Sequence, residues 1–228
     1  MVGSWPGTAP ANCGRPVYPA WRNAQLAVYD PAAFVWYFDT NGDGHINTMP
    51  FNGVYDAAPI SYGFAGGIPV AGSWDGMASD GIGIFKDGVW YLRHSDGTTE
   101  TRFFGAAGDK PFVVPVVVGT SAVIAVYRPS THMVYLAIPD GSGNGFTAVD
   151  PFAGMAPPAW LSWPGSDPRP SALMNSTGGW GYAIFDRAIG WWTFGAANPA
   201  RPNGVSLGVA GDYEMVGMNP CYGERIPN

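Results

Sequence analysis

The chain repeats one short pattern four times. In each copy an apolar run with a small residue near its start is followed, after a turn, by a second apolar or aromatic run. The four copies are Leu26-Ala27-Val28-Tyr29 with Trp36-Tyr37-Phe38, Ile82-Gly83-Ile84-Phe85 with Trp90-Tyr91-Leu92, Ile124-Ala125-Val126-Tyr127 with Val134-Tyr135-Leu136, and Tyr182-Ala183-Ile184-Phe185 with Trp191-Trp192-Thr193-Phe194. The period of two predicts strands, so each copy predicts a β-hairpin. A unit recurring at this spacing is typical of blade or solenoid arrays.

The repeated unit is larger than its hairpin. A Pro-led apolar segment precedes each hairpin: Pro16–Trp21, Pro69–Trp74, Pro111–Val116 and Pro170–Met174. Aromatic- or Leu-rich stretches ending in a Gly turn complete the units: Tyr62–Gly67, Phe103–Asp109, Trp163–Asp167 and Leu207–Asp212. Four short strands per unit are what a propeller blade requires.

We therefore predict an all-β fold: one small, four-bladed β-propeller closed by contact of the N- and C-terminal segments. Its units span about 14–64, 65–107, 108–165 and 166–212, and residues 213–228 form a closing segment. That segment contains a fifth copy of the Pro-led element, Tyr213–Met218, which supplies a closing strand or belongs to a further blade. An ordinary β-sandwich is the alternative.

Composition narrows the class of protein. The 228 residues include 33 Gly and 22 Pro, yet 46% are hydrophobic, which indicates a turn-rich folded chain rather than disorder. Charged residues make up 12%, the formal charge is −6 and no basic cluster is present, which argues against nucleic acid or an anionic membrane as partner. The longest apolar stretch, Val113–Tyr127, is interrupted by Pro115 and Gly119 and is too short to insert in a bilayer.

The two cysteines, Cys13 and Cys221, flank the repeated region. Because a circular array places its first and last units side by side, we expect a Cys13–Cys221 disulfide, which would stabilise the closed ring by roughly 4–5 kcal/mol. A disulfide implies an extracytoplasmic location, secreted, periplasmic or at the cell surface. No signal peptide is visible at Met1–Trp5. Two unrelated thiols in a reducing compartment are the alternative.

Three phrases of the sequence resemble the FG-GAP/VCBS-like repeats of bacterial secreted and surface proteins. They are Trp36–Gly44, Gly67–Gly76, and Gly108–Pro111 together with Ile124–Thr131 and Tyr135-Leu136. The resemblance covers about residues 14–218 and is weaker in the fourth unit. It implies β-propellers, often with calcium in the Asp/Gly loops, that serve adhesion or ligand binding. Since relatives also accompany catalytic domains, it constrains the fold more than the function.

One loop is a candidate calcium site. Asp39, Asn41, Asp43 and Asn47 place oxygens at positions 1, 3, 5 and 9 of an EF-hand-type loop, with His45 between them. Position 12 is Pro50 instead of a bidentate carboxylate, so a plain Asp/Asn/Gly turn is the alternative. The resemblance points to a second stretch, Asp75–Asp80, in which Met77 and Ala78 replace oxygen donors.

The first and third units contain long insertions, at residues 39–60 and 139–160. We expect both to lie between the third and fourth strands, and so to frame a cleft on one rim from opposite sides of the ring. Their aromatic residues are the predicted ligand-binding set, with packing of the blades as the alternative role: Phe51, Tyr55, Phe146, Phe152 and Trp160.

We thus predict a non-catalytic extracellular binding or assembly module for a protein partner, within a larger surface assembly. A lectin-like propeller that binds glycans, with calcium assisting, is the first alternative. A polysaccharide-active hydrolase or lyase is the second, and would need a carboxylate pair on one rim, drawn from Asp39, Asp56, Asp140 and Asp150. The three histidines fall at unrelated places in their repeats, which disfavours a three-histidine metal centre.

Overall fold

The computed structural model describes residues 2–3, 25–40, 56–76, 80–114, 121–138, 145–151, 166–174, 180–188, 191–194 and 205–206. The all-β class is confirmed: these residues form four antiparallel sheets of four strands each, and none of them lies in a helix. No helix within these ranges is long and apolar enough to cross a membrane.

Each sheet is a meander of four consecutive strands. Sheet one contains β1 (Val2–Gly3), β2 (Gln25–Asp30), β3 (Val35–Asp39) and β4 (Ile60–Ser61). Sheet two contains β5 (Ile68–Gly72), β6 (Gly81–Lys86), β7 (Val89–Arg93) and β8 (Thr99–Phe103). Sheet three contains β9 (Lys110–Val114), β10 (Val123–Arg128), β11 (Met133–Leu136) and β12 (Thr147–Val149). Sheet four contains β13 (Pro168–Met174), β14 (Trp180–Asp186), β15 (Trp191–Phe194) and β16 (Val205–Ser206).

The four predicted hairpins are the central strand pairs of the four sheets, in the same register. The small residue of each second strand lies opposite the third strand's last apolar residue, in the pairs Ala27↔Phe38, Gly83↔Leu92, Ala125↔Leu136 and Ala183↔Phe194. Neighbouring side chains leave little room at this position. A Cβ on Gly83 would lie 2.8 Å from the Leu92 side chain and 3.0 Å from that of Val70.

Three of the Pro-led segments form the first strands of their sheets. Pro69, Pro111 and Pro170 pair with Ile84, Val126 and Ile184 respectively. The first strand of each sheet is an edge strand, which tolerates a residue without an N–H group. In sheet one this edge is formed by Val2–Gly3, which pairs with Gln25 and Leu26. Pro16–Trp21, expected there, lies outside the described residues, as do Cys13 and Cys221.

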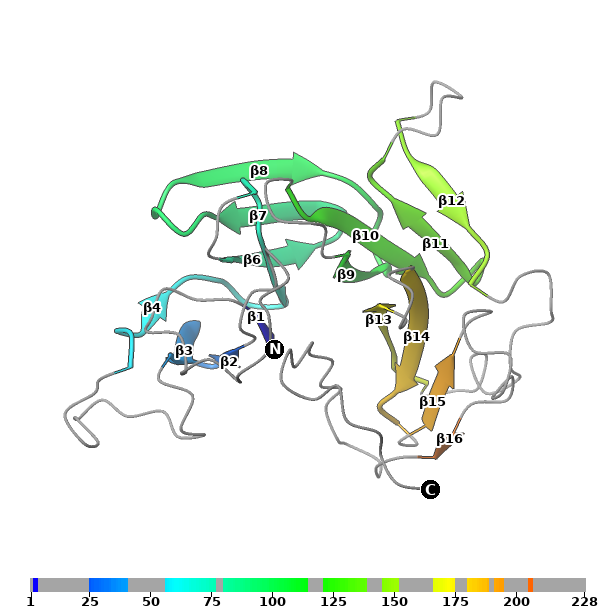
Figure 1. Cartoon of the computed structure of the whole chain (residues 1–228), viewed down its shortest axis with the longest axis horizontal. Helices are drawn as coiled ribbons and strands as arrows, with labels where there is room; N and C mark the ends of the chain where they lie inside the picture. Colours follow the sequence, from blue (N-terminus) through cyan, green and yellow to red (C-terminus); the bar gives the residue numbers. More distant parts are fainter. Residues whose placement is uncertain are drawn as a thin grey trace, which may run out of the picture.

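The sheets pack face to face in chain order, and the second strand supplies the contact. Ile82 and Ile84 of sheet two join a core cluster with Ala27, Trp36 and Phe38 of sheet one. In the same way, Ile124 and Val126 of sheet three pack on sheet two, and Ile184 of sheet four packs on sheet three. Figure 1 shows the four sheets following one another along an arc, with their first strands toward its inner side. Contacts of β1 with β5, β5 with β9 and β9 with β13 agree with this view.

The expectation for the second insertion was wrong. Residues 139–160 do not form one connection between the third and fourth strands, because β12 (Thr147–Val149) lies within them and pairs with β11. The Thr147 hydroxyl donates to Ile138 O at 2.8 Å, and Val149 packs on the core of sheet three. Phe146 therefore precedes the fourth strand, whereas Asp150 directly follows it at the other end of that strand.

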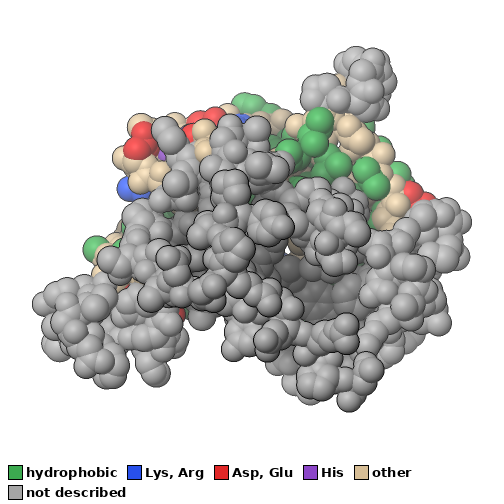
Figure 2. Space-filling view, viewed as in Figure 1, with side chains coloured by type: hydrophobic (Ala, Val, Ile, Leu, Met, Phe, Trp, Pro, Cys, Tyr) green, Lys and Arg blue, Asp and Glu red, His purple; other side chains and the backbone are tan. Residues whose placement is uncertain are grey.

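Side chains of different kinds gather over different sheets. In Figure 2 acidic, basic and histidine side chains lie over the end of sheet two, and hydrophobic side chains over sheet three. Among the described residues, the large hydrophobic side chains most open to solvent are Phe103, Val28 and Ile138.

Candidate binding groove

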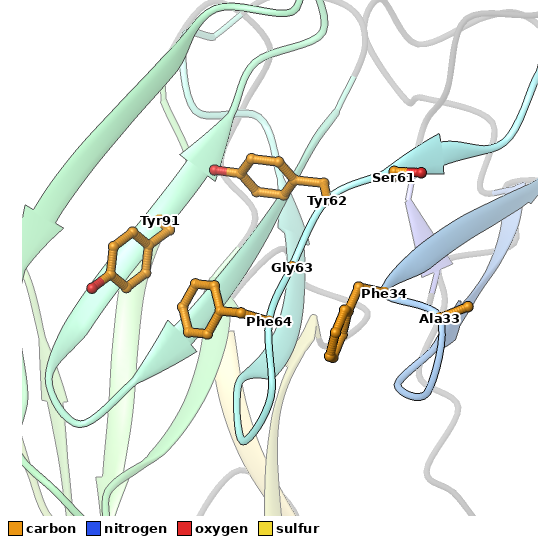
Figure 3. A pocket seen from close by; sticks show the side chains of 7 residues that line it. All are labelled: Ala33, Phe34, Ser61, Tyr62, Gly63, Phe64 and Tyr91. Carbon is orange, nitrogen blue, oxygen red and sulfur yellow. The ribbon is translucent and has the colours of Figure 1, made fainter.

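An open groove lies between sheet one and sheet two. Its volume is about 460 Å³, and it is lined by Ala33, Phe34, Ser61, Tyr62, Gly63, Phe64 and Tyr91. Three elements supply these residues: the β2–β3 turn, the end of β4 with the connection to β5, and strand β7. Figure 3 shows the rings of Phe34 and Phe64 on facing elements, with Tyr91 beyond Phe64. Four aromatic rings thus come together from separate parts of the chain.

The two loops of the groove are fixed by hydrogen bonds. The Asp30 carboxylate accepts from Ala32 N at 2.8 Å and from Ala33 N at 3.2 Å, which holds the β2–β3 turn. Phe34 ends this turn with φ at +57°, a conformation unfavourable for a bulky residue. Tyr62 N donates to Phe34 O at 2.9 Å, and so ties the β4–β5 connection to the turn.

A glycine and a buried tyrosine lie beneath the groove. Gly63 has φ at +143°, and a Cβ there would lie 2.4 Å from the Tyr29 hydroxyl, so this position requires glycine. The Tyr29 hydroxyl is buried and has no hydrogen-bond partner in the described part of the chain. Burial raises the pKa of Tyr29, and the charge of Asp30 adds to the effect. The hydroxyl is therefore a protonated donor at neutral pH.

Phe64 forms one wall of the groove. Its ring meets the Tyr91 ring edge-on, with centroids 5.0 Å apart and an interplanar angle of 87°. The Lys86 ammonium lies 5.8 Å from the Phe64 centroid and donates to Ala65 O at 3.1 Å. Burial raises the pKa of Tyr62, although the charge of Arg93 acts in the opposite direction. The groove thus offers aromatic faces, neutral hydroxyls and one cation near its wall.

At the equivalent seam, between sheets two and three, the corresponding tyrosine is covered by other side chains. Tyr135 lies opposite Val126, as Tyr91 lies opposite Ile84, so the two tyrosines hold the same register position. The Arg128 guanidinium lies 4.6 Å from the Tyr135 centroid, and Phe146 meets that ring edge-on at 5.7 Å. Arg128 is held by a bidentate pair with buried Asp109, with both contacts at 2.8 Å. The open groove is therefore not a necessary result of packing one sheet on the next.

Of the predicted ligand-binding residues, only Phe146 is described, and it packs on Tyr135. Phe51, Tyr55, Phe152 and Trp160 lie outside the described residues. The groove itself uses residues that the sequence placed in strands and turns. The stretch Tyr62-Gly63-Phe64 was visible as aromatic, but its meeting with Phe34 and Tyr91 depends on how the two sheets pack.

The base of the first insertion is closed by hydrogen bonds. Asp56 accepts from Thr40 N at 2.8 Å, and Ala57 N donates to the Thr40 hydroxyl at 2.9 Å. Asp39, the first predicted calcium ligand, is buried at the end of β3. The others, Asn41, Asp43, His45 and Asn47, lie outside the described residues, so calcium binding there stays a prediction. The described ranges contain no group of three or more His, Cys, Asp or Glu side chains arranged so that they could hold a metal ion.

A polar cluster at the end of sheet two joins three elements. The ring nitrogens of His94 lie 3.3 Å from an Asp75 oxygen and 3.2 Å from a Glu100 oxygen. Arg102 pairs with Glu100 and donates to Trp74 O at 3.2 Å. The cluster thus links β8 to the β5–β6 connection. His132, by contrast, lies in the β10–β11 turn and bonds the Tyr127 hydroxyl at 2.9 Å.

The carboxylates proposed for catalysis, where they are described, lie at different places in or beside sheets one and three. Asp56 closes the base of the first insertion, Asp39 is buried in β3, and Asp150 directly follows β12. Asp140 lies outside the described residues.

Comparison with known proteins gives no match. No protein-family model matches the chain, and neither does a curated protein or a solved structure. The resemblance to FG-GAP/VCBS-like repeats therefore stays a prediction from the sequence.

Proposed function

We propose that the four sheets are the blades of a four-bladed β-propeller completed by the terminal segments. Two observations support this. The second strands of sheets two, three and four pack branched apolar residues on the preceding sheet, and the first strands lie beside one another on the inner side of the arc. A Cys13–Cys221 disulfide would hold the two ends of such a ring together, outside the cytoplasm.

On this scaffold the protein is a non-catalytic binding module for another protein, and the groove of Phe34, Tyr62, Phe64 and Tyr91 is its binding site. The observation that carries the proposal is the difference between two equivalent seams. Tyr135 is covered by Arg128 and Phe146, whereas Tyr91 borders an open groove of about 460 Å³. A rigid scaffold with aromatic side chains at an open seam is typical of a recognition surface.

The ligand class follows from the lining. Among the described residues that line the groove, the polar side-chain groups are the hydroxyls of Ser61, Tyr62 and Tyr91, and none of these lining side chains is charged. An extended proline-rich segment suits such a surface, because its rings pack on aromatic faces and its carbonyls accept hydrogen bonds from tyrosine hydroxyls. Glycans also stack on aromatic rings, but their many hydroxyls call for carboxylate, amide or guanidinium partners, which the described lining residues do not include.

Isothermal titration calorimetry with a decaproline peptide tests the proposal. We expect saturable binding to the protein, and at least tenfold weaker binding to the Phe34→Gly variant, since one of the four rings is lost. Glycine suits the positive φ at this position, so the variant keeps its fold. The matched control is Phe103→Ala, which removes an exposed ring outside the groove and should leave the affinity unchanged.

Two results would contradict this function. One is equal binding by the Phe34→Gly and Phe103→Ala variants, which would place the peptide elsewhere. The other is no peptide binding together with binding on a glycan array that Phe34→Gly abolishes, which would make the groove a lectin site. Running that array with and without calcium also tests the predicted ion site at residues 39–47.

A further inference from the structure

One apolar face of sheet one is open where the other sheets are covered. Val28, Ile84, Val126 and Ile184 hold the same register position, each one residue after the small residue of the second strand. Ile84 and Val126 are 0% exposed and Ile184 is 2% exposed, because each packs on the preceding sheet. Val28 is 53% exposed.

The residue paired with Val28 is of the type that pairs with the buried residues at this register position in sheets two and three. Val28 pairs directly with Tyr37, just as Ile84 pairs with Tyr91 and Val126 with Tyr135. Both of these other tyrosines contact aromatic rings from elsewhere in the chain, Phe64 and Phe146 respectively. A β-branched residue paired with an aromatic one is typical of a buried sheet face rather than a solvated one.

We infer that this face of sheet one, centred on Val28 and Tyr37, is the docking surface for the chain's own C-terminal segment, residues 207–228. The order of the chain supports this occupant. The first strands of successive sheets contact one another: β1 contacts β5, β5 contacts β9, and β9 contacts β13. After β13, the next segment that resembles the Pro-led element is Tyr213–Met218. Its apolar residues are Tyr213, Met215, Val216 and Met218.

The length of the segment allows the contact. Strand β16 ends at Ser206, at the outer edge of sheet four. The roughly 20 residues that follow can span up to about 70 Å when extended. Figure 1 shows sheets one and four at the two ends of the arc. The segment therefore starts at one end of the arc, and its extended length is greater than the diameter of a compact domain of 228 residues.

Photo-crosslinking tests this inference in the full-length chain. Benzoylphenylalanine is introduced at position 28, the protein is irradiated, and the joined peptides are identified by mass spectrometry. We expect an intramolecular crosslink to a peptide within residues 207–228. The control places the same group at position 103, where the native side chain is 81% exposed, and should give no such crosslink.

Every other product at position 28 overturns the inference. A crosslink to residues 166–206 would mean that sheet four itself covers the face, and an adduct of doubled mass would mean a second copy. A crosslink elsewhere, or none, would also be incompatible with it. As a second measurement, Val28→Asp should lower the melting temperature by roughly 4 °C or more, because a charge would be buried, while Phe103→Asp should leave it nearly unchanged. Equal effects would show that the face is solvated. Neither measurement depends on peptide binding at the groove.

Discussion

At the scale of single residues, equivalent positions in the four sheets carry different side chains, and the Tyr29 position shows the consequence. Tyr29, Phe85, Tyr127 and Phe185 share one register position. The Tyr127 hydroxyl bonds His132, whereas that of Tyr29 is buried without a partner among the described residues. A buried polar group without a partner costs about 1–3 kcal/mol. Sheets two and four avoid this cost by using phenylalanine.

We therefore expect Tyr29→Phe to raise the free energy of unfolding by about 1 kcal/mol, since it removes an unsatisfied hydroxyl and keeps the ring. Tyr127→Phe is the matched comparison and should lower it by about 1 kcal/mol, because it breaks the bond to His132. Urea denaturation of both variants measures the two changes. A loss of stability in Tyr29→Phe equal to that in Tyr127→Phe would show that the Tyr29 hydroxyl has a partner.

At the scale of elements, the charged residue that ends the second strand of sheets two, three and four binds the loop that precedes the same sheet. The Lys86 ammonium donates to Ala65 O, and the Arg128 guanidinium donates two hydrogen bonds to the Asp109 carboxylate. Asp186 accepts from the Ser166 hydroxyl at 2.8 Å and from Asp167 N at 3.2 Å. The same place in these three sheets is thus held by different chemistry: an ammonium, a guanidinium and a carboxylate.

We expect the interactions of Arg128 and Lys86 to contribute differently to the free energy of unfolding. The Asp109 side chain is 2% exposed, so Arg128→Ala leaves a buried carboxylate without its charged partner, and we expect a loss of about 3 kcal/mol in unfolding free energy. Lys86→Ala removes one exposed hydrogen bond at the equivalent position and should cost less than about 1 kcal/mol. Denaturant titration of the two variants compares them, and similar small losses would mean that Asp109 is solvated in the variant.

The sequence predicted the elements unequally, and burial explains the difference. In sheets two and three the second strand is buried at nearly every residue and the third strand at alternate residues, so both were visible as apolar runs, as in Ile82–Phe85 and Trp90–Leu92. The outer strands bury little: Thr99–Phe103 alternates between exposed and half-buried residues, and Thr147–Val149 is too short to show a pattern. For this reason the third unit's fourth strand was expected beyond residue 160. The groove was missed because Phe34 and Tyr91 meet only through the packing of two sheets.

At the scale of the whole molecule, an ion-pair cluster crosses the seam between sheets three and four. Asp167, just before β13, accepts from Arg169 at 2.8 Å and lies 3.3 Å from the Lys110 ammonium on β9. Burial acts to raise the pKa of Asp167, but the hydrogen bonds and charges of Arg169 and Lys110 outweigh it, so the pKa lies below its usual value. Protonation of this carboxylate therefore weakens the contact between the two sheets.

This shift predicts how stability depends on pH. Because the pKa of Asp167 is lower in the folded chain, its contribution is fully present above the unfolded-state pKa of about 3.9 and is lost as the pH falls through the folded-state value. We expect Asp167→Asn to cost up to about 1 kcal/mol at pH 7, since the groups are partly exposed, and the difference from the native chain to shrink below about pH 4. Denaturation midpoints from pH 7 to pH 3 measure it. Phe103→Ala, which changes no titrating group, should keep a constant offset, and a constant offset for Asp167→Asn as well would mean that the seam does not depend on this charge.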